Sequence, residues 1–124
     1  MAATLYVCTT CKAGQPVLDG EERPGARLHA ALAENPPAEV HVVAVECLSA
    51  CDNGCSVALQ APGKWGYVYG HMTEADAAEI RAGAEAYAGA PDGLVPWRER
   101  PVIFRKQSLA RIPPLEFPTP KAAE

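Results

Sequence analysis

Five cysteines gathered into two short groups constrain the fold of this chain more than any other feature. They are Cys8, Cys11, Cys47, Cys51 and Cys55. The first two form a C-x-x-C motif at the end of the apolar stretch 4–8, and the other three form C-x3-C-x3-C after the β-branched stretch 40–45. A fold that pairs these two stretches as parallel strands also brings both cysteine groups to one end of the sheet.

A helix between the two stretches would connect them in this way. Pro24 suits the first turn of a helix and Pro36-Pro37 stops one, so we expect a helix through Ala33. A strand–helix–strand unit is nearly always a right-handed crossover between parallel strands. The stretch 40–45 is almost continuously apolar, which favours a strand buried on both faces, with His41 in the core rather than at a metal.

The second half of the chain predicts a hairpin and a last helix. Residues 56–60 and 65–69 predict strands, and Pro62-Gly63 between them is a turn signal. The alternating aromatic residues of the second strand are expected in the core. Thr73 and Asp76 predict the capped start of a helix. The element order is then β-α-β-β-β-α, that of a thioredoxin-like α/β sandwich.

Charge and proline content divide the chain of 124 residues into a domain, 1–90, and a C-terminal extension, 91–124. The domain holds five basic and eleven acidic residues, whereas the extension holds six basic and four acidic residues and seven of the twelve prolines. We expect an extended, proline-rich tail. Its segment 102–104 is expected to add an edge strand or to pack on the core or on a second copy, leaving arginines for an acidic partner.

Charge and hydropathy also exclude some classes of protein. A formal net charge of −4 argues against a nucleic-acid binder, which needs a surplus of basic residues. No stretch approaches the ~18 consecutive apolar residues of a membrane span, and the N-terminus lacks the pattern of an export signal. We therefore expect a cytoplasmic protein whose thiols stay reduced.

Four thiolates brought together in a reducing compartment bind zinc or an iron–sulfur cluster. A structural zinc site is one alternative. A second is a dithiol oxidoreductase that uses Cys8 and Cys11, but no helix is predicted after Cys11 to lower a thiol pKa. Inert buried thiols are a third, which the confinement of five cysteines to two loops argues against. No pairing of nucleophile and base indicates an enzyme.

The second cysteine loop and the elements after it resemble the second half of the thioredoxin-like [2Fe–2S] ferredoxins. The resemblance is carried by 47–54, by the hairpin 57–68 and by the helix start 72–76, and 6–9 resembles the strand that ends at the first ligand of those ferredoxins. The whole chain resembles more closely a group of small bacterial proteins described as predicted metal-binding, of the DUF1636 type. Some members of that group are associated with cobalamin synthesis.

The resemblance implies a one-electron carrier with a [2Fe–2S] cluster, redox partners (a reductase and an acceptor enzyme) and a homodimer. It implies Cys8, Cys47 and Cys51 as ligands. We expect Cys11 as the fourth ligand, because a C-x-x-C pair chelates one iron, with Cys55 as the alternative. The ferredoxins space their first two ligands more widely, and they tend to have proline at the position of Cys55. A [4Fe–4S] cluster, or a zinc- or cobalt-binding or delivery protein, uses the same thiolates.

Overall fold

The computed structural model describes residues 3–9, 23–46, 48 and 55–114. The elements are β1 (Ala3–Cys8), α1 (Pro24–Glu34), β2 (Val40–Val45), β3 (Val57–Gln60), β4 (Gly66–Tyr69), the 3-10 turn η2 (Glu74–Asp76), α2 (Ala77–Gly89), the 3-10 turn η3 (Trp97–Glu99), α3 (Val102–Lys106) and β5 (Ser108–Ile112). The first six strands and helices follow the predicted order β-α-β-β-β-α, which confirms the mixed α/β architecture.

The five strands form one sheet in the order β2-β1-β3-β4-β5. β1 and β2 are parallel, as the crossover through α1 requires, and the remaining neighbours are antiparallel. The hairpin turn between β3 and β4 contains Gly63, whose φ of 74° lies in the region that glycine adopts without strain. The predicted hairpin is therefore confirmed, including the residue that turns it.

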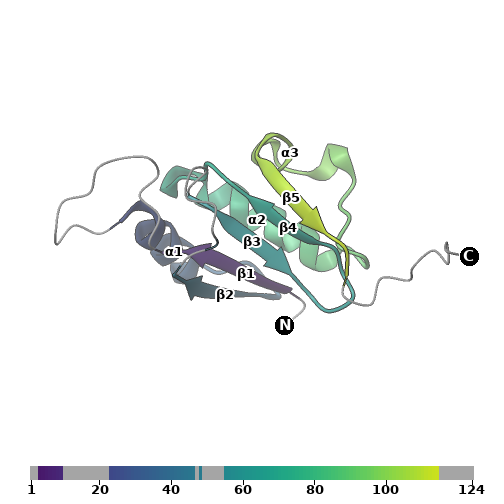
Figure 1. Cartoon of the computed structure of the whole chain (residues 1–124), viewed down its shortest axis with the longest axis horizontal. Coiled ribbons are helices and arrows are strands. Elements are labelled where there is room, and N and C mark those ends of the chain that lie inside the picture. Colours follow the sequence, from purple (N-terminus) through teal and green to yellow (C-terminus); the bar gives the residue numbers. More distant parts are fainter. Residues whose placement is uncertain (1–2, 10–22, 47, 49–54, 115–124) are drawn as a thin grey trace, which may run out of the picture.

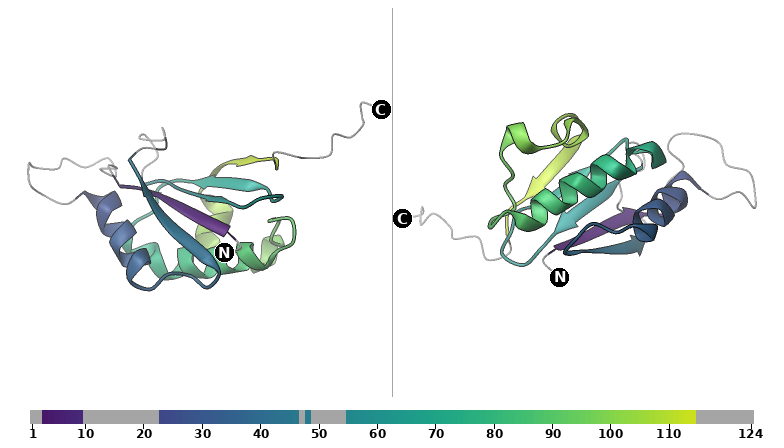
Figure 2. Two further views of the ribbon diagram at one scale, coloured as in Figure 1. Left: turned by 90° about the horizontal axis from the view of Figure 1, so that it is seen from below. Right: turned by 180° about the vertical axis from the view of Figure 1, so that it is seen from behind.

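Helices α1 and α2 cover one face of this sheet, whereas the opposite face carries no helix from the described part of the chain (Figures 1 and 2). Strand residues that alternate toward the helices are fully buried, among them Leu5, Val7, Val57 and Leu59. They pack with apolar residues of the helices, namely Leu28, Leu32, Ile80 and Ala84. The core thus lies between the sheet and the two helices.

The prediction that the strand 40–45 is buried on both faces was wrong. β2 is an edge strand of the sheet, and of its six residues only Val40 is buried. His41 is exposed, so its expected place in the core was also wrong. A β-branched run signals a strand but does not reveal whether a neighbouring strand or helix covers each side.

The extension packs on the domain in its described part, residues 91–114. Val95, Ile103 and Phe104 are buried in the same core as the strands, which confirms packing of the extension on its own chain. The alternative of an edge strand at 102–104 is wrong, because α3 begins there. The edge strand is β5, which pairs antiparallel with β4.

The helix start at Thr73, which leads into α2, is capped as predicted. The backbone amide of Thr73 donates to Oδ2 of Asp76 over 2.9 Å, and the amide of Asp76 donates to the carbonyl oxygen of Thr73. These bonds pair backbone groups that a helix start otherwise leaves without partners. The segment begins as the single turn η2 and continues as α2.

Candidate metal centre

Cys8 lies where three strands meet at one end of the sheet. It ends β1 and pairs with Val45, the last residue of the parallel strand β2. Its backbone amide donates to the carbonyl oxygen of Ser56 over 3.2 Å, immediately before β3 begins. At the left of Figure 1, β1 and β2 end and β3 begins side by side. The strand ends that lead into the two cysteine loops therefore meet at one end of the sheet, as predicted, and the loops beyond them lie mostly outside the described residues.

Both flanks of the loop that contains the second cysteine group contact Cys8, at Glu46 before the loop and at Ser56 after it. The thiol of Cys8 donates to the carbonyl oxygen of Glu46 over 3.5 Å, and Glu46 directly precedes Cys47. Both the backbone amide and the hydroxyl of Thr9 donate to the carbonyl oxygen of Val45, at 2.8 and 3.1 Å. Backbone contacts therefore hold the start of this loop against the end of β1.

The predicted ligands Cys11, Cys47 and Cys51 lie outside the described residues. Cys8 and Cys55 are described, and both are buried, with 4% and 0% of their surface exposed. Within 3–9, 23–46, 48 and 55–114, no three His, Cys, Asp or Glu side chains gather closely enough to hold a metal ion.

Strand alternation places the side chains of Cys8 and Cys55 on opposite sides of the sheet, and both belong to one cluster of buried core residues. In β1 the residues facing the helices are Leu5 and Val7, so alternation places Cys8 on the other side, with Tyr6. In β3, Val57 faces the helices, and the same alternation continued backwards places Cys55 on the helix side. There it is fully buried, and its carbonyl oxygen accepts from the amide of Met72 over 3.0 Å.

An apolar hollow of about 330 Å³ lies on the open face of the sheet and reaches the second cysteine loop. Its lining includes Tyr6, Val45, Leu48, Ala58, Val68 and Ile112. Leu48 directly follows Cys47, so the hollow extends from the middle of the sheet to the edge of the loop. A metal centre at this end would have an apolar wall on one side, which limits the access of water.

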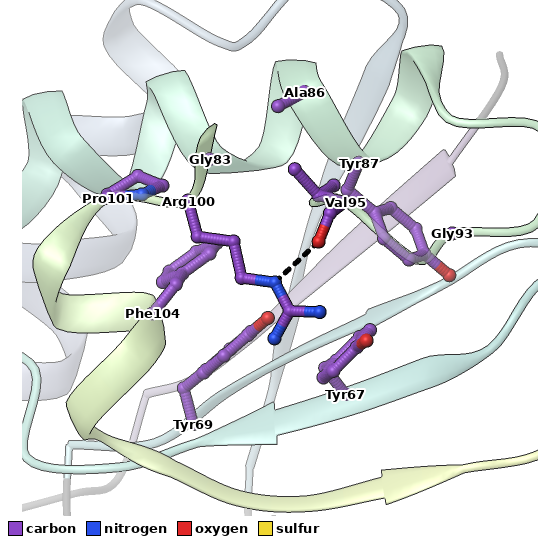
Figure 3. A pocket seen from close by; sticks show the side chains of 10 residues that line it. All are labelled: Tyr67, Tyr69, Gly83, Ala86, Tyr87, Gly93, Val95, Arg100, Pro101 and Phe104. Atoms are coloured by element: carbon purple, nitrogen blue, oxygen red, sulfur yellow. Dashed lines mark hydrogen bonds between the residues drawn. The ribbon is translucent and has the colours of Figure 1, made fainter. Parts of the chain in front are cut away.

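A second, small pocket lies on the helix side and is lined by Tyr67, Tyr69, Tyr87 and Arg100, among others (Figure 3). Its volume of about 10 Å³ is roughly that of one water molecule, so it does not fit a cofactor. Burial raises the pKa of Tyr69 and, to about 12, that of Tyr87, with the neighbouring Tyr67 adding to both shifts. Among the described residues, the buried hydroxyl of Tyr67 has no hydrogen-bond partner.

Reasoning from the sequence missed the role of the backbone around the cysteines. The carbonyl groups of Glu46 and Ser56 hold Cys8 in place. Their side chains give no signal for this role. Their positions beside Cys47 and Cys55 do give a signal. Residues that flank a loop at the end of a sheet pair their backbone groups with the neighbouring strand.

A family model described as "Protein of unknown function (DUF1636)" matches residues 5–114 of the chain. None of the curated proteins matches the sequence significantly. In the part of the chain that the structure describes, no helix has the length and apolar character to span a membrane.

Two solved structures share the fold. A thioredoxin-like [2Fe–2S] ferredoxin from Aquifex aeolicus has a TM-score of 0.55 and 17% identity, over 93% of this chain and 97% of that chain. A cysteine-to-serine variant of the thioredoxin-like [2Fe–2S] ferredoxin from Aquifex aeolicus has a TM-score of 0.55 and 16% identity, over 87% of this chain and 98% of that chain. The chain therefore has a thioredoxin-like ferredoxin fold.

Proposed function

The chain belongs to the DUF1636 family, and from its fold and cysteine loops we propose that it is a one-electron carrier with a [2Fe–2S] cluster. The cluster would lie at the end of the sheet where β1 and β2 finish, held by thiolates of two loops. In this proposal the protein is not an enzyme. It exchanges electrons with a reductase and an acceptor enzyme in the cytosol, where the thiols stay reduced.

The position of Cys8 is the observation that carries the proposal. Its amide and thiol contact both flanks of the second cysteine loop, at Ser56 and Glu46. A sulfur fixed between the two ends of a loop containing Cys47 and Cys51 is suited to share a metal with them. A four-thiolate donor set fits an iron–sulfur cluster, which can change its charge by one electron.

We assign Cys8, Cys11, Cys47 and Cys51 as the ligands. The face of the sheet on which each described cysteine lies supports this choice over Cys55. Alternation places Cys55 on the helix side and Cys8 on the open side, and of these two core thiols Cys55 is the more deeply buried, with 0% of its surface exposed against 4% for Cys8.

The residues around Cys8 would prepare it for metal. The backbone bonds of Cys8 to Ser56 and of Thr9 to Val45 fix the direction of the strand end. Binding of metal needs the thiolate, so it removes the proton that the Cys8 thiol donates to Glu46 in the structure. Leu48 and the apolar hollow beside it would keep water from one side of the site.

An anaerobic preparation of the full chain tests the proposal. We expect brown protein with visible absorption that dithionite bleaches, and equal amounts of iron and acid-labile sulfide. Two iron and two sulfide per chain indicate a [2Fe–2S] cluster, whereas four iron and four sulfide per chain would indicate a [4Fe–4S] cluster instead. Colourless protein that holds zinc or cobalt without sulfide, and that anaerobic reconstitution with iron and sulfide does not colour, would contradict the electron carrier. It would favour a metal-binding or delivery protein.

A further inference from the structure

The C-terminal extension exposes a large aromatic side chain, that of Trp97, to solvent. Trp97 in η3 is 58% exposed, and Val102 at the start of α3 is 51% exposed. Exposed tryptophan is uncommon, and tryptophan and arginine are the residues that most often dominate the binding energy of protein interfaces.

The indole of Trp97 lies beside two arginines that the backbone holds in place. The guanidinium groups of Arg100 and Arg105 lie 5.7 and 5.9 Å from the centre of its ring. Arg105 donates to the carbonyl oxygens of Trp97 and Arg98 over 2.9 and 3.0 Å. Arg100 donates to that of Val95 over 2.7 Å, the bond drawn in Figure 3. Both cations are thus ordered before any partner arrives, which lowers the entropy that binding must remove.

The positive charge of this segment is not neutralised within the described part of the chain. No carboxylate there forms an ion pair with Arg98, Arg100, Arg105 or Lys106. The side chains of Arg98 and Lys106 are exposed. Four cations and one carboxylate within ten residues therefore form a compact positive surface on a chain whose net charge is −4. We call this surface the Trp97 patch: Trp97, Arg98, Arg100, Val102, Arg105 and Lys106.

The Lys106 end of the Trp97 patch lies toward the end of the sheet that carries the cysteines. α3 ends at Lys106, and the next residue, Gln107, accepts a hydrogen bond from the amide of Gly70 over 2.9 Å. Two residues further along, the amide of Met72 donates to the carbonyl oxygen of Cys55. In Figure 1, α3 and the start of β5 accordingly lie toward the cysteine end of the sheet.

From these observations we propose that the Trp97 patch docks an acidic protein surface. The partner would be an acidic redox protein that exchanges electrons with the cysteine end, and in this respect the inference rests on the proposed function. Carboxylates of the partner would contact Arg98 and Lys106, while an apolar side chain covers the indole. A small patch on an acidic chain suits a carboxylate cluster better than a nucleic acid or an anionic membrane, whose charge would meet the acidic remainder of the protein.

Calorimetry on the full chain tests the docking with an acidic peptide of about twelve Asp and Glu residues that includes one Phe. We expect binding at low salt that weakens about tenfold or more as the salt concentration rises from ~20 to ~200 mM. The double variant Arg98→Glu with Lys106→Glu should weaken binding by a further factor of about ten or more. Trp97→Ala should weaken it about fivefold or more, because the indole supplies the apolar contact.

Arg23→Glu with Arg27→Glu, at the start of α1, is the control for net charge, since it changes the charge by the same amount. It also breaks the ion pair of Arg27 with Glu74, so urea unfolding of both double variants must show that they are folded. The control should alter the affinity about twofold or less. Equal weakening by both double variants, or no binding at low salt, would overturn the proposal. Tighter binding of a short DNA duplex or of phosphatidylserine vesicles than of the peptide would also overturn it, as would salt-sensitive self-association that the patch variant abolishes.

The colour of each preparation separates this proposal from the electron carrier. Brown protein that does not bind the peptide overturns the docking surface and leaves the carrier in place. Protein that stays colourless after anaerobic reconstitution with iron and sulfide, but that binds the peptide through the patch, overturns the carrier, and with it the identity of the partner as a redox protein.

Discussion

The ring of Phe104 occupies the space that a Cβ atom at Gly83 would need. Gly83 is buried in α2, and Phe104 is buried in α3 and stacks on Tyr69, with ring centres 4.0 Å apart. Because position 83 has no side chain, the extension can pack directly against α2. This contact attaches α3 to the domain.

We expect Gly83→Ala to destabilise the protein by about 1–3 kcal/mol, because the added methyl group must displace a stacked, buried ring. The midpoint of urea unfolding measures the loss. Gly89→Ala is the control: Gly89 ends the same helix, and a Cβ there would meet no atom within 4 Å. The control should be neutral or slightly stabilising. Similar losses in both variants would mean that helix conformation rather than the Phe104 contact sets the effect.

Single Cys→Ser variants should divide the cysteines into two classes. Cys8→Ser, Cys11→Ser, Cys47→Ser and Cys51→Ser should each lower the iron and sulfide content severalfold, since every thiolate holds the cluster. Cys55→Ser should keep both contents while losing about 1–3 kcal/mol of stability, because it puts a hydroxyl into the apolar core. Full loading of Cys11→Ser together with loss in Cys55→Ser would reverse the assignment of the fourth ligand.

The cysteine motif shows what could be predicted from the sequence. The β-branched stretch 40–45 and the helix that precedes it are local signals, and together they implied parallel strands that end at one edge of the sheet. The structure has this pairing, with Cys8 beside Val45. The hairpin turn at Gly63 and the cap at Thr73 are also local, and both were predicted correctly.

Features that depend on distant residues were harder to predict. His41 has apolar neighbours in sequence, yet β2 is an edge strand and the side chain is exposed. The short apolar run 102–104 fits a strand or a helix equally well. In the structure it forms a helix, which places the ring of Phe104 against Gly83. Folding of the extension brings the guanidinium groups of Arg100 and Arg105 beside the ring of Trp97. No local sequence pattern predicts this arrangement.

The small pocket on the helix side of the sheet contains two tyrosine hydroxyl groups, those of Tyr67 and Tyr87, that differ in their hydrogen bonding. Tyr87 donates to the carbonyl oxygen of Trp65, whereas the buried hydroxyl of Tyr67 has no partner in the described part of the chain. Tyr67→Phe should therefore be neutral or stabilising by up to about 1–2 kcal/mol, and Tyr87→Phe should cost about 1 kcal/mol. Thermal unfolding of the two variants gives the comparison. A loss in Tyr67→Phe as large as in Tyr87→Phe would show that a buried water molecule pairs its hydroxyl.

Stability should fall at alkaline pH through Tyr87. Burial raises the pKa of Tyr87 to about 12 in the folded chain, from 10.0 when exposed, and the neighbouring Tyr67 adds to the shift. Between these values the unfolded chain releases the proton and the folded chain keeps it. The free energy of unfolding is therefore unaffected by this proton below pH ~10, and it falls as the pH rises from ~10 toward ~12. The loss is on the order of 1–2 kcal/mol, since one pKa unit corresponds to about 1.4 kcal/mol and solvent screens part of the interaction.

Urea unfolding at a series of pH values measures this slope, with tyrosinate absorbance followed in the same samples. In Tyr87→Phe the stability should be lower at neutral pH, through loss of the bond to Trp65, but should fall less steeply above pH ~10. Burial also raises the pKa of Tyr69, so part of the slope should remain in this variant. An unchanged slope in Tyr87→Phe would mean that the folded chain releases the Tyr87 proton as readily as the unfolded chain, and that the pocket is open to water.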